Sequence, residues 1–227
     1  FSFSPDGVKF VGKSLGIDSE NRWLMVANSD GTGAQAIEEL GDNADKVQVA
    51  WSPNNLMIAT YTESKDFDRQ DVYLIGLHGE NFRSLNIDGR GFESNWSPQG
   101  NRLLYSVYSS DSDYKPTLWL AEIQGDSFQV KKNLNLNTWV EKCVFYNNDD
   151  IYCAVPQDLQ SGAGFSPELA RTTPDDIYQI NIASGAINKL DATTYGHTVE
   201  KITISTDGQY LYFTDINDGR LYQINLK

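Results

Sequence analysis

The stretch "AWSPNN" at residues 50–55 decides the fold, because the chain uses it repeatedly. It comes back as "NWSPQG" at 95–100, and the chain opens with "FSFSPDG" at 1–7. Proline presets φ for the second turn position, and Gly or Asn tolerates a left-handed fourth position. Weaker copies, "YNND" at 146–149 and "STDG" at 205–208, continue the series. Each copy therefore predicts a tight β-hairpin turn in a repeated unit.

The residues before these turns repeat as well. A large residue stands directly before each turn, and a small or medium one precedes it; the large ones are Phe3, Trp51, Trp96, Phe145 and Ile204. Neighbouring strand residues point to opposite faces, so one bulky and one small face suit an inner strand in a stack of twisted sheets. We expect Trp51 and Trp96 to be buried between such sheets.

Four strand-like segments lie between each turn and the next. After the second strand come a variable loop, a third strand such as "DIYQINI", a Gly-containing turn and a fourth strand such as "FRSLNI". Four short strands in roughly 45 residues are the signature of a propeller blade. The sequence thus predicts an all-β fold, a β-propeller of about five four-stranded blades in one domain. The expected blades are 1–45, 46–91, 92–137, 138–195 and 196–227, the last incomplete with three strands.

Composition excludes some partners. The 227 residues carry 18 Lys and Arg against 31 Asp and Glu, a net charge of −13. A protein that binds nucleic acid or an anionic membrane surface needs a basic face, and this acidic chain offers none. No apolar run approaches the ~20 residues of a membrane span, so this segment is not expected to insert into a membrane. No cofactor is predicted.

An aromatic residue followed by Ser-Pro-Asp-Gly, an aliphatic strand and a strand such as "IYQIN" resembles the WD-repeat-like blades of TolB-type β-propellers. The resemblance spans the whole chain, although the Gly-His and Trp-Asp signatures of true WD repeats are missing. Such blades occur in periplasmic scaffold proteins, in peptidase gating domains and in bacterial envelope proteins. The resemblance therefore implies an exported or envelope-associated protein, with any signal or anchor upstream of Phe1.

Variable loops on a rigid scaffold usually carry binding function. In a propeller, the loops between second and third strands share one face with the connections between blades. These loops predict a non-enzymatic module that binds a protein or peptide partner on that face. The candidate partner-binding residues are Asp66, Asp68, Arg69, Asp111, Asp113, Tyr114, Phe165, Glu168, Arg171, Tyr195 and His197.

The fourth blade carries an insertion at 156–174. Its Ser166-Pro167-Glu168 segment is typical of a capped helix start with proline in the first position. We expect the only helix of the chain near 166–171, with Phe165 and Leu169 packed onto the propeller. A decorative loop, a partner contact and a cap over the channel mouth all remain open as interpretations.

The alternative function is a propeller enzyme, or a propeller that binds a small ligand or glycan. Glycosidases use paired carboxylates, and Glu141 and Glu200 begin the inner strands of adjacent blades at the channel mouth. Lys142 and Lys201 follow them directly and would neutralise them. The sequence has no Gly-x-Ser-x-Gly elbow, so no catalytic residue is assigned. This alternative requires Glu141, Glu200 and His197 to converge in one cleft.

Neither metals nor cysteines define a site. The acidic stretch "KDFDRQD" at 65–71 lacks the Gly that a calcium loop places at its sixth position, and no His or Cys shows metal-ligand spacing. Cys143 and Cys153 flank a predicted hairpin turn and could face each other on paired strands. A disulfide and two buried free thiols both remain open.

The last blade raises the question of closure. It ends after its third strand, near 219–226, while the first blade begins at its innermost strand. An open sheet edge leaves unpaired backbone groups, so we expect a strand upstream of Phe1 to complete the blade. An uncovered edge at 219–226 would permit self-association by strand addition.

Overall fold

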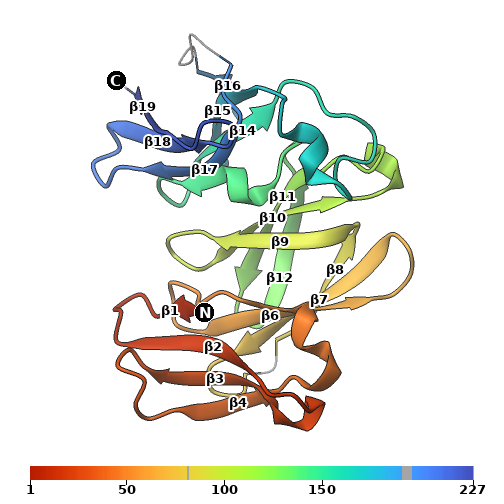
Figure 1. Ribbon diagram of the computed structural model, residues 1–227, viewed down its shortest axis with the longest axis vertical. Helices are drawn as coiled ribbons and strands as arrows, with labels where there is room; N and C mark the ends of the chain where they lie inside the picture. Colours follow the sequence, from red (N-terminus) through yellow and green to blue (C-terminus); the bar gives the residue numbers. More distant parts are fainter. Residues whose placement is uncertain (81, 191–195, 227) are drawn as a thin grey trace. The chain divides into compact units, whose positions relative to one another are not determined.

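The computed structural model describes residues 1–80, 82–190 and 196–226. In these ranges the chain forms β-strands and short 3-10 helices, with no α-helix. The strands make five antiparallel sheets, one after another along the chain (Figure 1). No helix in the described ranges is both long and apolar enough to cross a membrane.

The first three sheets have four strands each, and each strand pairs with its neighbour in the sequence. The first contains β1 (Ser2–Phe3), β2 (Lys9–Leu15), β3 (Arg22–Asn28) and β4 (Gln35–Glu39). The second contains β5 (Val47–Val49), β6 (Met57–Ser64), β7 (Arg69–Gly76) and β8 (Leu85–Asp88). The third contains β9 (Arg90–Trp96), β10 (Arg102–Tyr108), β11 (Thr117–Gln124) and β12 (Ser127–Asn133).

The last two sheets differ in strand number. The fourth contains β13 (Cys143–Phe145), β14 (Asp150–Pro156), β15 (Asp175–Asn181) and β16 (Ile187–Lys189). The fifth contains β17 (Val199–Ile204), β18 (Tyr210–Asp215) and β19 (Leu221–Asn225). No fourth strand joins it from the described residues. The predicted all-β fold, with an incomplete last blade, is confirmed.

The predicted repeat turns are confirmed, and side chains close three of them. The turn serine donates from Oγ to the third turn residue at 2.6–2.7 Å, in the pairs Ser4–Asp6, Ser52–Asn54 and Ser205–Asp207. The same Oγ accepts the N–H of the residue five positions onward, at 2.9–3.0 Å. The fourth turn residue is left-handed, with φ between 60° and 69°, at Gly7, Asn55, Gly100 and Gly208. Only Gly and Asn adopt this backbone readily, which is why the motif recurs with them.

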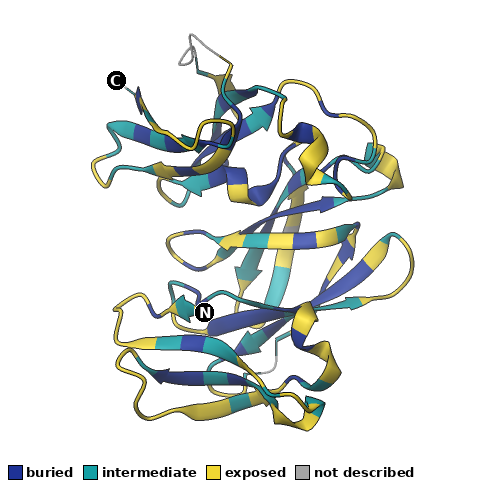
Figure 2. Cartoon of the chain, in the orientation of Figure 1, coloured by how far each residue is buried: buried dark blue, intermediate teal, exposed yellow. Residues whose placement is uncertain are grey.

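The chain divides into two compact units. Unit 1 comprises 1–88, 99–102 and 122–130, and unit 2 comprises 89–98, 103–121 and 131–227. Buried and exposed residues alternate along many strands, so the sheets contribute apolar faces to the cores of the units (Figure 2). The core of unit 1 includes Val11, Leu24, Trp51 and Ile58, and that of unit 2 includes Leu104, Leu118, Ile151, Ile177, Ile180 and Leu211. The expectation of one domain stays a prediction.

The expected burial of the tryptophans holds in part. Trp51 is only 7% exposed, whereas Trp96, the last residue of β9, is half-buried. Phe3 is 52% exposed. Its strand β1 has only two residues, and its ring lies near Phe1 and Phe10 at centroid distances of 5.7 and 6.2 Å.

The expectation of a single helix is wrong. η5 (Pro167–Ala170) lies at the predicted place and begins with proline, but it is a 3-10 helix. Four others are η1 (Ser19–Asn21), η2 (Gly41–Lys46), η3 (Ser110–Ser112) and η4 (Val140–Lys142). Such short turns need no periodic apolar pattern, so the sequence does not reveal them.

Candidate binding groove

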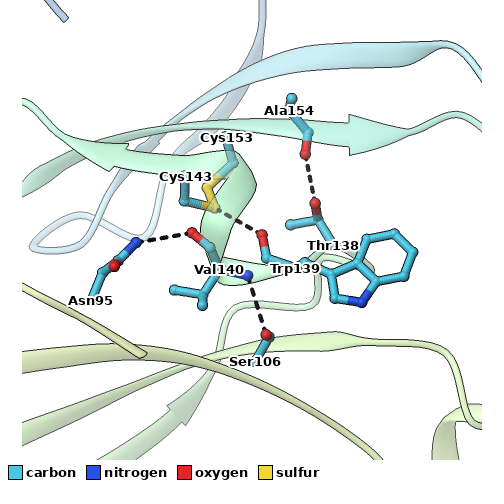
Figure 3. The surroundings of a disulfide bond; sticks show 8 residues. All are labelled: Asn95, Ser106, Thr138, Trp139, Val140, Cys143, Cys153 and Ala154. Atoms are coloured by element: carbon cyan, nitrogen blue, oxygen red, sulfur yellow. Dashed lines mark hydrogen bonds between the residues drawn. A yellow bond between two sulfur atoms is a disulfide. The ribbon is translucent and has the colours of Figure 1, made fainter. Parts of the chain in front are cut away.

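The 3-10 helix η4 is held between two sheets of unit 2 (Figure 3). On one side, the Val140 N–H donates to Ser106 Oγ at 3.1 Å, and Asn95 Nδ2 donates to the Val140 carbonyl at 3.1 Å. On the other side, Thr138 Oγ1 donates to the Ala154 carbonyl at 2.6 Å. These bonds fix the backbone at Glu141, which the sequence had placed at the start of a strand. Glu141 lies instead in η4, directly before β13.

A disulfide joins Cys143 to Cys153, which decides between the two alternatives left open by the sequence. The two residues are paired partners on β13 and β14, with Cα atoms 4.1 Å apart. Both are buried in the core of unit 2 (Figure 3). The bridge therefore anchors the strand that follows η4.

Lys142 forms a buried ion pair with Asp175, rather than neutralising Glu141. Its Nζ lies 3.0 and 2.8 Å from the two carboxylate oxygens of Asp175, whose side chain is fully buried. The Val199 N–H also donates to Asp175 Oδ2 at 2.6 Å. Burial raises the pKa of Asp175, and the Lys142 charge opposes that rise. The charge of Lys142 is thus balanced mainly by Asp175 in the protein interior.

The insertion between β14 and β15 has a small core of its own. Leu159, Ala163 and Ala170 are buried together with Trp139, which precedes η4. The insertion is also tied to the β10–β11 loop by main-chain bonds, from Gly162 N to the Asp113 carbonyl and from Gly164 N to the Tyr114 carbonyl, both 2.8 Å. These contacts pack the insertion onto unit 2.

The aromatic ring of Phe165 lies on this frame. It is 47% exposed and packs on Tyr108 and Tyr114 at centroid distances of 4.7 and 5.0 Å. Gly164 permits the insertion to approach Tyr108 this closely, because a Cβ there would lie 2.4 Å from the Tyr108 ring. Leu169 is 41% exposed, so its expected packing onto the propeller is not observed. The small residues Ala163 and Ala170 pack there instead.

Two adjoining hollows of about 310 and 380 Å³ lie beside the insertion. They share Trp139, Glu141 and Pro167 in their walls, so we treat them together as the insertion groove. Glu93, Tyr108 and Phe165 line the first hollow, and Glu168, Arg171 and Glu200 line the second. The structure thus brings the predicted channel-mouth glutamates and three predicted partner-binding residues to one groove.

Glu93 and Glu141 are electrostatically coupled. Desolvation raises the pKa of both carboxyl groups, and the charge of Glu141 raises the pKa of Glu93 further. The charge of Lys142 lowers the pKa of Glu141, but by less than desolvation raises it. Within the described ranges, no Lys or Arg forms an ion pair with either carboxylate. Glu93 and Glu141 therefore have no ion-pair partner among the described residues, and the charge of Lys142 offsets that of Glu141 only in part.

His197 does not join this groove. Its Nδ1 lies 2.7 Å from Asp215 Oδ2, and its ring packs on Tyr222 and Phe213 at 4.2 and 5.3 Å. The convergence of His197 with Glu141 and Glu200 that the enzyme alternative required is not observed. Tyr195, the neighbouring candidate, lies outside the described residues.

The remaining candidates lie on other loops. Asp66, Asp68 and Arg69 belong to unit 1, where Arg69 pairs with Asp66 at 2.5 Å. Asp111 is exposed in η3, and Asp113 follows it with a left-handed φ of 53°. In the described ranges, no three His, Cys, Asp or Glu side chains gather closely enough to hold a metal.

Unit 1 has a larger hollow of its own, about 560 Å³. Tyr61, Tyr73 and Ile37 line it, with Glu38 and Glu80 among its charged residues. None of the predicted site residues contributes to its walls.

Sequence reasoning missed Glu93, Tyr108 and Trp139. Glu93 was missed because counting back from the repeat turn selects its neighbour Phe92. Phe92 is only 3% exposed and lies in the core. Tyr108 lies directly before the loop at 109–116, and Trp139 lies before β13, outside the variable loops. A useful signal would have been the paired glycines Gly91 and Gly164, since a Cβ at either would meet the Tyr108 ring.

Comparison with solved structures shows the fold. No protein-family model matches the sequence, and no relative was found among curated proteins. TolB from Acinetobacter baumannii superposes with a TM-score of 0.57 at 15% identity, covering 96% of this chain and 53% of TolB. The propeller domain of the Trilobed protease from Pyrococcus furiosus gives 0.57 at 14% identity, covering 96% and 66% of the two chains. An acylaminoacyl peptidase from Pyrococcus horikoshii gives 0.64 at 14% identity, covering 98% and 36%.

The chain therefore has a β-propeller fold, with TolB-type and peptidase propellers among its structural neighbours. It spans about half the length of TolB. At these identities the likeness is one of fold, and the neighbours include both TolB and peptidases.

Proposed function

We propose that this protein is a non-enzymatic β-propeller module that binds an extended segment of a protein or peptide in the insertion groove. The observation that carries the proposal is the groove itself, walled by an insertion with its own core and by the half-exposed ring of Phe165. An exposed aromatic residue beside a rigid hollow is typical of peptide-binding surfaces.

The disulfide supports an exported protein. Disulfides persist in oxidising compartments such as the bacterial periplasm and are rare in the cytosol. The Cys143–Cys153 bridge is thus in keeping with a role in the cell envelope.

A direct test is selection of short random peptides displayed on phage against the intact chain. We expect the selected peptides to bind in the groove, so Phe165→Ala should weaken their binding by about tenfold, as for an interface anchor. Phe67→Ala is the matched control, because Phe67 is 59% exposed and lies in unit 1. Peptides that ignore Phe165→Ala would contradict the proposal.

The enzyme alternative keeps one specific observation in its favour. Glu93 and Glu141 are coupled carboxyl groups with raised pKa values in a groove, which is the pattern of acid–base sites. Hydrolysis of aryl glycosides by the intact chain, abolished by Glu141→Gln, would favour this function over simple binding.

A further inference from the structure

The charges of the insertion groove do not balance. Glu93, Glu141, Glu168 and Glu200 lie along its walls, and the two cations there are Lys142 and Arg171. Lys142 is already paired with Asp175 in the interior. Arg171 lies in the second hollow only. The first hollow, with Glu93 and Glu141, is therefore left without a cation of its own.

Desolvation raises the pKa of both Glu93 and Glu141, and the charge of Glu141 raises that of Glu93 further, although both residues keep exposed surface at the hollow. A positive group placed between them would remove the repulsion and make charge-assisted hydrogen bonds.

The walls around these carboxylates are apolar and aromatic. Tyr108, Phe165 and Trp139 line the same hollow as Glu93 and Glu141. Lys and Arg side chains combine a long apolar stem with a charged head, and both heads are attracted to aromatic faces. The aromatic walls of the hollow fit the apolar stem of such a side chain, and the carboxylates fit its charged head.

We propose that the insertion groove recognises a basic segment, whose Lys or Arg side chain enters the hollow between Glu93 and Glu141 with its stem against Phe165. This inference rests on the proposed function and names the chemistry of the partner. The acidic character of the whole chain, with a net charge of −13, would further attract a basic partner.

The test uses the peptides selected on the intact chain, resynthesised with each Lys and Arg replaced by Gln. We expect the Gln versions to bind about tenfold more weakly, and the parent peptides to lose affinity as salt is raised. Glu141→Gln and Glu93→Gln should each weaken the parent peptides by a similar factor. Glu20→Gln, which changes a glutamate of η1 in unit 1, is the matched control and should leave affinity unchanged.

The outcomes separate the two proposals. Peptides that respond to Phe165→Ala but bind equally well without Lys or Arg overturn the basic-segment inference and leave peptide binding in place. Peptides that ignore both changes overturn both proposals. Because the peptide substitutions do not touch the protein, a folding defect in a glutamate variant cannot obscure the result.

Discussion

Among single residues, Glu93 and Glu141 couple the groove to pH. Their folded-state pKa values lie above those of the unfolded chain, because the groove walls disfavour the charged forms. The stabilising contribution of each group is fully present below its unfolded pKa. It is lost as pH rises through the higher folded pKa.

We expect Glu141→Gln to remove this loss. The variant should gain stability relative to the wild type as the pH is raised from about 4 to about 7, the range in which these carboxyl groups ionise. Urea unfolding at both pH values measures the difference. A constant difference between the two proteins at both pH values would show that Glu141 ionises normally.

The buried Lys142–Asp175 pair should be sensitive to loss of one partner. Asp175→Asn leaves the Lys142 charge buried without its anion and should cost about 3–5 kcal/mol of unfolding free energy. The double variant Lys142→Met with Asp175→Asn should cost less, since no uncompensated charge remains. Urea denaturation of both variants checks the order, and a more costly double variant would contradict it.

Three of the four groove glutamates show why residue-level site prediction was incomplete. Glu141 lies in a 3-10 helix, Glu200 lies at a register shift of β17, and Glu93 lies beside a register shift of β9. Bulges and tight turns re-aim side chains, so counting back from the repeat turns does not locate every side chain at such positions. Glu141 and Glu200 were found from their positions, whereas Glu93 was missed.

At the scale of elements, the hairpin of β13 and β14 anchors the connection that carries Glu141. Its disulfide closes a loop across a sequence separation of 10 residues, next to the hydrogen bonds of Val140 and Thr138. A cross-link of this kind restricts the unfolded chain more than the folded one.

Replacing both cysteines with alanine should lower the unfolding free energy by about 2–3 kcal/mol, as expected for a short disulfide loop. Denaturant unfolding of the variant measures this, with the wild type in reducing agent as an independent comparison. If neither treatment changes the midpoint, the bridge does not contribute to stability.

Elements governed by local chemistry were predictable, whereas those that depend on distant partners were not. The repeat turns follow from Ser, Pro and Gly within four residues, and they indicated the repeated four-stranded sheets. The insertion is different, because its core depends on Trp139, which is separated from it by the whole β13–β14 hairpin. Its sequence alone could not show whether it packs or which residues it buries.

For the molecule as a whole, the three-stranded last sheet is the irregular member of an otherwise regular series. The Asp215 N–H of β18 donates to the Arg220 carbonyl at 3.0 Å, and the Leu226 N–H donates to the carbonyl of Gln209, directly before β18, at 2.9 Å. In an antiparallel pair the bonded positions alternate, so the backbone groups of Leu221 and Gln223 point away from β18. β19 itself contains no charge or proline to discourage pairing with another strand.

We therefore expect concentration-dependent self-association of this chain through β19, unless another strand covers it. Leu221→Lys should reduce it, because Leu221 is 67% exposed and a lysine on an edge opposes strand pairing. Sedimentation velocity over a concentration series measures the effect, with Leu56→Lys as control for the added charge. A wild-type chain that stays monomeric throughout would contradict the expectation.

The main-chain bonds from Gly162 and Gly164 to the carbonyls of Asp113 and Tyr114 have a consequence for diversification. These main-chain bonds depend little on the loop side chains, apart from the glycine at 164 that Tyr108 requires and the glycine at 162, whose φ of 84° is left-handed. Positions such as Asp111 and Glu168 can thus be randomised while the two loops keep their mutual position. The pair of loops is in this sense a ready-made library frame, in which new binding specificities can be selected without redesigning the backbone.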